Sequence, residues 1–197
     1  MDQATLDKIA IREVIESWAI FRDTGDFKRL ATCFHDDGVM MSTWFHGAAA
    51  EFVERARVSY ARGNMSSHIL GAIQIDLAGN RAIAQTRATI ASRDAIDGVL
   101  YDIACIGRMY DFFEKRNGRW AIAERRLTYE KDRADPVIPG MTHTFDEALL
   151  GQFPDGYRYL GYAQTKRGQT VLRTLPGLRG PEVEALYAKG KAWLAGN

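Results

Sequence analysis

The sequence predicts an α+β fold in which N-terminal helices pack across one face of a curved, mainly antiparallel sheet. Apolar residues recur every three or four positions before residue 63, as on helices, and about every second position over residues 66–131, as on strands. Asn117-Gly118 stands between two of the strand-like runs and is the strongest signal for a tight hairpin. Helices followed by a run of strands are typical of α+β domains.

Three helices are predicted before residue 64, and they cover residues 5–21, 26–34 and 48–63. The first carries one apolar stripe that includes Trp18, and either Asp2 or Thr5 is expected to cap it. Thr24-Gly25 breaks the pattern, and Asp26 begins the second helix. Residues 35–38 predict a turn that leads into a first strand over residues 39–44.

Four longer strands are predicted after the helices, and they cover residues 68–77, 81–92, 99–116 and 119–131. Residues 1–131 are therefore expected to form one domain, and residues 132–197 a C-terminal extension that holds all five prolines. The extension has too many aromatic residues to stay in water, so we expect it to pack on the domain or on a neighbouring subunit. Pro181 begins a last helix.

Composition excludes several classes of partner. The 26 basic and 25 acidic residues of the 197 nearly balance, which argues against binding nucleic acid or an anionic membrane through bulk charge. No apolar run approaches about 18 residues and no export leader is recognisable, so we expect a cytoplasmic protein without membrane contact. Cys33 and Cys105 lie in apolar contexts and predict buried thiols in a reducing compartment. We expect neither a metal nor another cofactor, because the common binding motifs are absent.

The stretch over residues 18–30 places Arg22 and Asp23 where the first helix ends, and His68 begins the first long strand. A histidine oriented by a buried aspartate acts as a general base, because the carboxylate fixes the tautomer and stabilises the imidazolium that forms. Taken alone, the spacing favours a plainer interpretation, in which Asp23 caps the second helix and His68 is a satisfied core residue.

Three stretches resemble the SnoaL-like branch of the nuclear transport factor 2-like superfamily: residues 18–30, residues 68–71, and the run from 107 to 120. The resemblance covers residues 5–131 and implies a cone-shaped α+β barrel with a deep pocket. Members include scytalone dehydratase, hexachlorocyclohexane dehydrochlorinase, steroid isomerases, polyketide cyclases and binding modules. In the first two enzymes, an aspartate ending the first helix pairs with a histidine at the start of a barrel strand. Those positions match Asp23 and His68, so the resemblance favours a catalytic dyad.

The sequence departs from the dehydratase at two places. Arg22 stands where that enzyme has an aromatic residue, and Ser92 or Arg93 falls where it has a second catalytic histidine. We expect Arg22 either to stabilise a developing oxyanion by charge-assisted hydrogen bonds or to pair with Asp26 on the surface. These departures indicate the same proton-transfer dyad acting on a different substrate.

Further substrate-binding candidates are Trp44, Arg108 and Tyr110. Trp44 follows the first strand, where it either stacks on an aromatic ligand or packs in the core. Arg108 and Tyr110 share one face of a strand, and an inward arginine would need a partner that the pocket could supply. Asp111 points to the other face, where we expect it to pair with Arg125 or Arg126.

These features predict a cofactor-independent lyase that uses His/Asp general-base catalysis on a small hydrophobic, aromatic substrate. Dehydration, or retro-aldol loss of formaldehyde from a lignin-type diaryl compound, would both use such a base. Two alternatives stay open: a non-catalytic module of the same fold that binds a small molecule or a partner, and an isomerase or cyclase acting on a polycyclic substrate. The apolar extension indicates a homo-oligomer, and the resemblance favours a trimer over a dimer.

Overall fold

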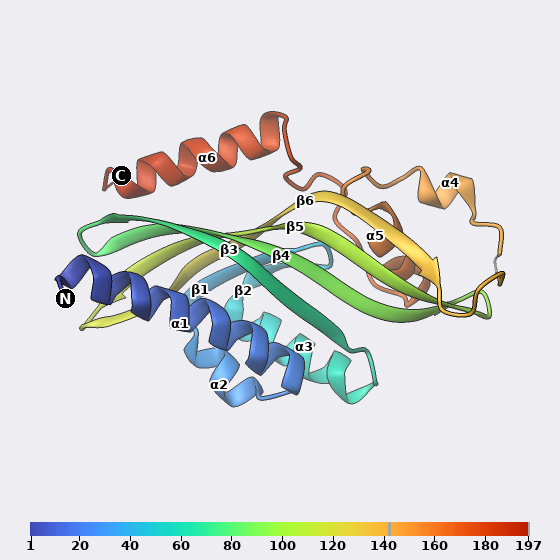
Figure 1. Cartoon of the computed structure of the whole chain (residues 1–197), viewed down its shortest axis with the longest axis horizontal. Helices are drawn as coiled ribbons and strands as arrows, with labels where there is room; N and C mark the ends of the chain where they lie inside the picture. The colour runs from blue at the N-terminus through green and yellow to red at the C-terminus, as the bar shows by residue number, and fades with distance from the viewer. Residues whose placement is uncertain (142, 197) are drawn as a thin grey trace.

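The protein is built on one mixed sheet of six strands in the order β2-β1-β6-β5-β4-β3. The structure, a computed structural model, describes residues 1–141 and 143–196. The strands are β1 (Phe34–Ser42), β2 (Phe45–Ala48), β3 (Ser66–Ala78), β4 (Arg81–Ile96), β5 (Val99–Arg116) and β6 (Arg119–Pro136). The predicted α+β class and the curved sheet are confirmed (Figure 1), but the sheet is not closed into a barrel, since β2 and β3 form its two edges.

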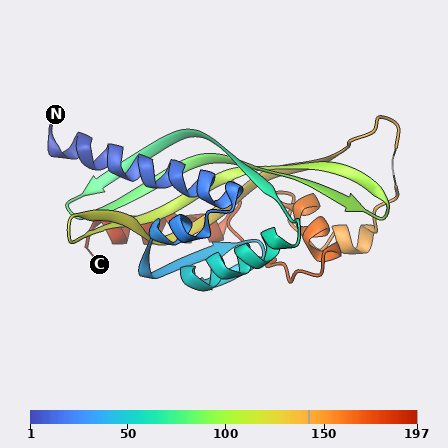
Figure 2. The same ribbon diagram turned by 90° about the horizontal axis from the view of Figure 1, so that it is seen from below.

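Helices cover the two faces of the sheet unequally. The face that we call the inner face carries the N-terminal helices α1 (Gln3–Thr24), α2 (Phe27–Thr32) and α3 (Ala49–Ala61), with α1 running beside β3 (Figures 1 and 2). The outer face carries α6 (Pro181–Leu194), which packs on β4. Most buried apolar side chains belong to one large core under the inner-face helices, and α6 covers a smaller cluster of its own.

The ends of α1 follow directly from the sequence. Asp2 caps the helix, because its Oδ1 accepts a hydrogen bond of 2.8 Å from the backbone N–H of Thr5. Gly25 ends it with a φ of 79°, and its backbone N–H donates to the carbonyl of Phe21. Asp23 therefore lies in the last turn of α1, with its side chain free to face the sheet.

The first strands differ from the sequence prediction. Residues 35–38, expected to form a turn, belong to β1, which begins at Phe34 and contains a register shift against β6 before Val39. Residues 45–48, which lie between the predicted first strand and the third helix and include the first residue expected in that helix, form the short strand β2 in a hairpin with β1. The predicted hairpin at Asn117-Gly118 is present, with φ values of 52° and 79° that suit a primed turn.

The C-terminal extension packs on both faces of the sheet. Strand β6 runs to Pro136, so the sheet continues past the expected domain boundary at residue 131. Helix α5 (Arg158–Lys166) contacts the inner face at β6 and is preceded by the short α4 (Glu147–Leu150), whereas α6 returns across the outer face. Within residues 1–141 and 143–196, no helix has the length and apolar character needed to cross a membrane.

Candidate active site

A cavity lies on the inner face, where side chains from α1, α3 and α5 meet strands β1, β3, β4 and β6. Its volume is about 60 Å³, enough for roughly four waters at about 15 Å³ each. Apolar side chains form much of its wall, among them Trp18, Met40, Trp44, Phe52, Ile90 and Leu127. Polar side chains complete it, among them Arg22, Ser42, His68, Ser92, Gln164, Arg167 and Gln169. A compact ligand with an apolar body and polar edges suits such a site.

Asp23 holds His68 through both of its carboxylate oxygens. Oδ1 lies 2.6 Å from the ring Nδ1 of His68, and Oδ2 accepts a 2.6 Å hydrogen bond from the backbone N–H of the same residue. Because a carboxylate accepts hydrogen bonds, Nδ1 carries the ring proton and Nε2 keeps its lone pair. His68 also lines the cavity, so Nε2 is the ring nitrogen left for a ligand. Asp23 does not cap α2; Asp26 does, by accepting from the backbone N–H of Arg29.

The surroundings of His68 keep the imidazole neutral. Burial lowers the pKa of His68 below 6.5, and the hydrogen bond to Asp23 opposes this shift only in part. The charges of Arg22 and Arg125 lower the pKa further. Trp18 presents an edge-to-face contact to the imidazole, with ring centroids 5.1 Å apart. A neutral, fixed imidazole with a free Nε2 is in the state that a general base requires.

Arg22 is a buried cation at the same cavity. Its side chain lines the cavity, and the residue is only 7% exposed, so the alternative of a surface pair with Asp26 is wrong. Asp26 instead pairs with Arg29, at 2.5 Å. Burial lowers the pKa of Arg22 and the charge of Asp23 opposes that shift, but a guanidinium stays protonated near neutral pH. Its Nη1 has no hydrogen-bond partner among the residues that the structure describes.

A buried ion pair supports the tryptophan that touches His68. Arg125 binds Asp111 through two hydrogen bonds, of 2.6 and 2.7 Å, and both side chains are fully buried. The guanidinium carbon of Arg125 lies 4.3 Å from the ring centroid of Trp18. The predicted cross-strand partner of Asp111 is thus Arg125, while Arg126 pairs with Glu124. The ion pair between Arg125 and Asp111 therefore holds Trp18, which forms part of the cavity wall, from the side that faces the sheet.

Trp44 lines the cavity, as expected of a substrate-binding residue, and it also packs in the core. Its ring stacks on Phe52 at 5.5 Å, and Phe52 in turn stacks on Trp18 at 6.3 Å. These rings give the cavity an aromatic wall drawn from α1, α3 and the β1–β2 turn. An aromatic ligand could extend the same stack.

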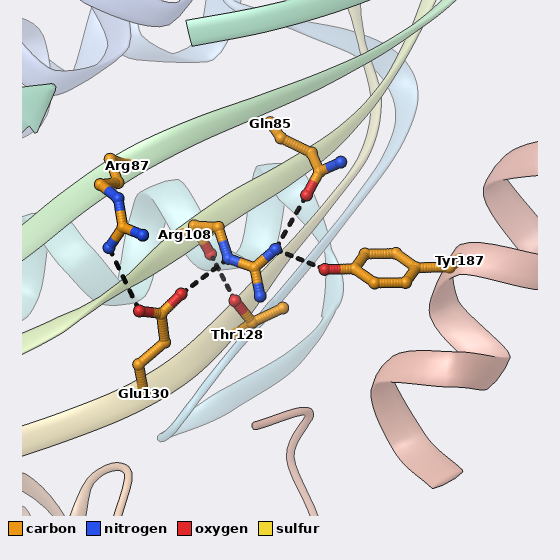
Figure 3. Close-up of polar contacts among 6 residues, drawn as sticks. All are labelled: Gln85, Arg87, Arg108, Thr128, Glu130 and Tyr187. Carbon is orange, nitrogen blue, oxygen red and sulfur yellow. Dashed lines mark hydrogen bonds and ion pairs between the residues drawn. The ribbon is translucent and has the colours of Figure 1, made fainter. Parts of the chain in front are cut away.

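Arg108 and Tyr110 lie on the outer face, so the expectation that they meet a substrate in the cavity is corrected. Arg108 donates to Glu130 at 2.8 Å, to Gln85 at 3.0 Å and to the hydroxyl of Tyr187 on α6 (Figure 3). Tyr110 packs beneath α6 beside Tyr187. Alternation along the strand predicts that both share a face, but it does not say which face is covered by the pocket helices.

Several cavity residues from the C-terminal extension escaped the sequence analysis. Gln164 lies on α5, and Arg167 and Gln169 follow that helix. Arg167 pairs with Asp94 at 2.7 Å, and Asp94 accepts a hydrogen bond of 2.8 Å from Ser92, which also lines the cavity. These contacts join segments about seventy residues apart, and no local periodicity signals them.

Among residues 1–141 and 143–196, no group of three or more His, Cys, Asp or Glu side chains could hold a metal ion.

Residues 3–126 match the SnoaL-like domain family. The chain belongs to this family. Pea pathogenicity protein 2 of Fusarium vanettenii is 31% identical over 206 residues, which cover 99% of this chain and 88% of that protein. The uncharacterized protein AN9274 of Emericella nidulans is also 31% identical, over 211 residues covering 99% and 89%. Similarity to these relatives therefore continues through the C-terminal extension.

Solved structures share the SnoaL-like fold at low identity. A proposed scytalone dehydratase from Novosphingobium aromaticivorans superimposes with a TM-score of 0.58 at 17% identity, covering 71% of this chain and 97% of that one. The hexachlorocyclohexane dehydrochlorinase LinA type 2 gives 0.56 at 13% identity, covering 73% and 96%. The predicted resemblance to the superfamily is confirmed. At these identities the likeness concerns the fold alone.

Proposed function

We propose that this protein is a cofactor-independent lyase in which His68, oriented by Asp23, takes a proton from a small aromatic substrate. The observation that carries the proposal is the double contact of Asp23, which binds both the ring and the backbone of His68 beside the cavity. Arg22 is proposed to stabilise the oxyanion that develops on the substrate, because its Nη1 has no partner in the described part of the chain.

Two bond cleavages use this arrangement. In a dehydration, Nε2 of His68 takes a C–H proton beside a carbonyl, the C–H electrons form a C=C bond, and the hydroxyl on the next carbon leaves as water with that proton. In a retro-aldol cleavage, Nε2 takes the proton of a hydroxymethyl O–H, and the O–H electrons form the C=O bond of formaldehyde as the C–C bond breaks. The electrons of the C–C bond form an enolate with the substrate carbonyl, and the enolate carbon then takes the proton back from Nε2. In both, the carbonyl oxygen gains charge that Arg22 can stabilise.

The walls of the cavity indicate the shape of the substrate. Aromatic rings along one wall, including Trp44 and Phe52, suit a flat substrate. Dehydration of an aryl ketone and deformylation of an aryl compound both act on a flat substrate.

A binding module without chemistry is the competing function. Such a module needs a cavity and polar contacts, but it gains nothing from a histidine whose tautomer is fixed by a carboxylate. The lowered pKa of His68 and the fixed proton on Nδ1 instead suit proton transfer. For this reason we favour the enzyme.

A turnover screen tests the proposal. Hydroxylated cyclic aryl ketones are followed for the absorbance of a new conjugated enone, and hydroxymethyl aryl compounds for free formaldehyde. For any compound that turns over, Asp23→Asn and His68→Ala are expected to lower kcat about 10²–10⁴-fold. His46→Ala, a change at an exposed histidine of β2, is the matched control and should keep full activity. Full activity in both dyad variants would rule the mechanism out.

A further inference from the structure

The cavity gathers buried polar atoms that have no hydrogen-bond partner within the described part of the chain. They are Nε1 of Trp18, Nη1 of Arg22, Oγ of Ser42, Oε1 of Gln164, Nε of Arg167 and Oε1 of Gln169. Buried polar groups are nearly always paired, because an unpaired group loses its hydration without compensation. A cluster of unpaired groups around one cavity indicates that a polar ligand or bound water completes them.

Arg22 and Gln164 are among the side chains of this group that are more than nine-tenths buried, and they come from different helices. Arg22, at the end of α1, is 7% exposed, and Gln164, on α5, is 5% exposed. The carboxylate next to Arg22 is Asp23, both of whose oxygens already accept hydrogen bonds from His68. The guanidinium therefore needs an oxygen acceptor, and the amide of Gln164 can pair with a hydroxyl, which both donates and accepts.

The remaining wall is apolar and aromatic. Trp18, Trp44 and Phe52 form a continuous stack along it. A ligand that packs beside such a wall is flat and polar only at its edges.

We propose that Arg22 and Gln164 form a two-ended polar clamp that selects single-ring ligands carrying both an oxygen acceptor and a hydroxyl group. Arg22 binds the acceptor, such as a carbonyl or phenolate oxygen, and Gln164 binds the hydroxyl. The clamp adds a substrate class to the proposed function. It rests on that function in one respect, since the clamp assumes that the cavity is the substrate site.

The clamp makes the C-terminal extension a determinant of specificity. The SnoaL-like match ends at residue 126, whereas Gln164 belongs to α5. Asp132 in β6 anchors that helix by accepting a 2.8 Å hydrogen bond from the backbone N–H of Leu160. Leu160 lines the cavity together with Gln164, so the anchor fixes one wall of the binding site.

Binding of matched probes that have no leaving group for the lyase to remove tests the hydroxyl end. Calorimetry compares 4-hydroxyacetophenone with 4-methylacetophenone, in which a methyl group replaces the hydroxyl. The wild-type protein is expected to bind the hydroxylated probe about tenfold more tightly, as one net hydrogen bond to a buried group allows. Gln164→Leu should reduce that preference to within about twofold. Gln152→Leu, the same change at an exposed position, should leave it intact.

The acceptor end is tested with 4-ethylphenol, in which a methylene replaces the carbonyl of the hydroxylated probe. Arg22→Met should remove the wild-type preference for the ketone over this analogue. The Gln164 comparison stands by itself if Arg22→Met fails to fold. Equal wild-type affinity for hydroxyl and methyl probes, a preference that survives Gln164→Leu, or no saturable binding of the hydroxylated probe at millimolar concentration would each overturn the clamp.

The clamp and the lyase fail in different ways. His68→Ala is expected to abolish turnover while the preference for the hydroxylated probe remains. If His68→Ala leaves turnover unchanged and the preference holds, the proposed chemistry is wrong and the clamp stands. If turnover depends on His68 but the preference is absent, the clamp is wrong and the chemistry stands.

Discussion

At the scale of single residues, His68 is held in one orientation by contacts from several sides. Asp23 fixes its ring and backbone, and the edge of Trp18 limits movement of the ring. Arg125 lies over Trp18 and is itself fixed by Asp111. A chain of contacts thus connects a fully buried ion pair to the proposed general base, and each link can be tested separately.

The pH dependence of activity should report the lowered pKa of His68. Because burial favours the neutral imidazole, the acid limb of kcat/KM is expected to have its midpoint below pH 6.5. The unfolded chain takes up the proton near pH 6.5 and the folded chain resists it, so the free energy of unfolding should fall as the pH drops below about 6.5.

Rate profiles and urea unfolding between pH 5 and pH 8 measure the two effects. His68→Ala should remove part of the loss of stability at low pH. An acid limb with its midpoint above pH 6.5 would contradict the account of the site.

The ion pair behind Trp18 predicts a large loss of stability when one partner is removed. Arg125→Met leaves the Asp111 carboxylate buried without its partner, which is expected to cost about 3–5 kcal/mol of the free energy of unfolding. Arg93 binds Asp102 with the same two distances, 2.6 and 2.7 Å, on the surface. Arg93→Met is therefore the matched control and should change stability little. If Arg125→Met and Arg93→Met lose equal free energy of unfolding in urea, burial does not account for the contribution of the Arg125–Asp111 pair to stability.

At the scale of elements, the extension supplies α5 to the cavity and α6 to the outer face. Period-two alternation predicts the long strands and the shared face of Arg108 and Tyr110, because side-chain direction is a local property. It could not predict that α6 covers this face, since that depends on where a segment eighty residues later returns. The dyad was predictable from matched family positions, whereas Gln164 lies outside them.

The docking of α6 depends on a close approach at Gly190. A Cβ at this position would stand 1.9 Å from the hydroxyl oxygen of Tyr110. Gly→Ala in a helix interior normally stabilises by up to about 1 kcal/mol. Here Gly190→Ala is expected to destabilise by about 1–3 kcal/mol through overpacking.

Thermal or urea unfolding measures that change. Tyr110→Phe in the same chain removes the clashing oxygen and should recover part of the loss. A stabilised Gly190→Ala variant would mean that α6 does not pack against β5 at this point.

At the scale of the whole molecule, the sheet leaves one long edge uncovered. Strand β3 is that edge, and its Ile69 is 62% exposed, as is Ile20 on α1. Exposed apolar residues on an edge strand favour pairing with another chain. These exposed residues support our proposal that the protein is a homotrimer with β3 near the interface.

The proposed assembly predicts a mass in solution. Light scattering after gel filtration is expected to give about three times the 22.1 kDa of one chain. Ile69→Lys should shift the protein toward smaller species. Leu178→Lys, which places the same charge at an exposed aliphatic residue outside β3, should not. A wild-type monomer or dimer would overturn the proposed trimer.

Proton exchange tests the central claim, that His68 oriented by Asp23 is a general base, most directly. NMR in D₂O follows replacement of the methyl protons of 4-hydroxyacetophenone, a reaction that requires proton abstraction and breaks no other bond. The wild-type protein is expected to accelerate exchange above the buffer rate, His46→Ala to match it, and Asp23→Asn to slow it. His68→Ala should return exchange to the buffer rate. Equal rates for the wild type and His68→Ala would contradict the claim.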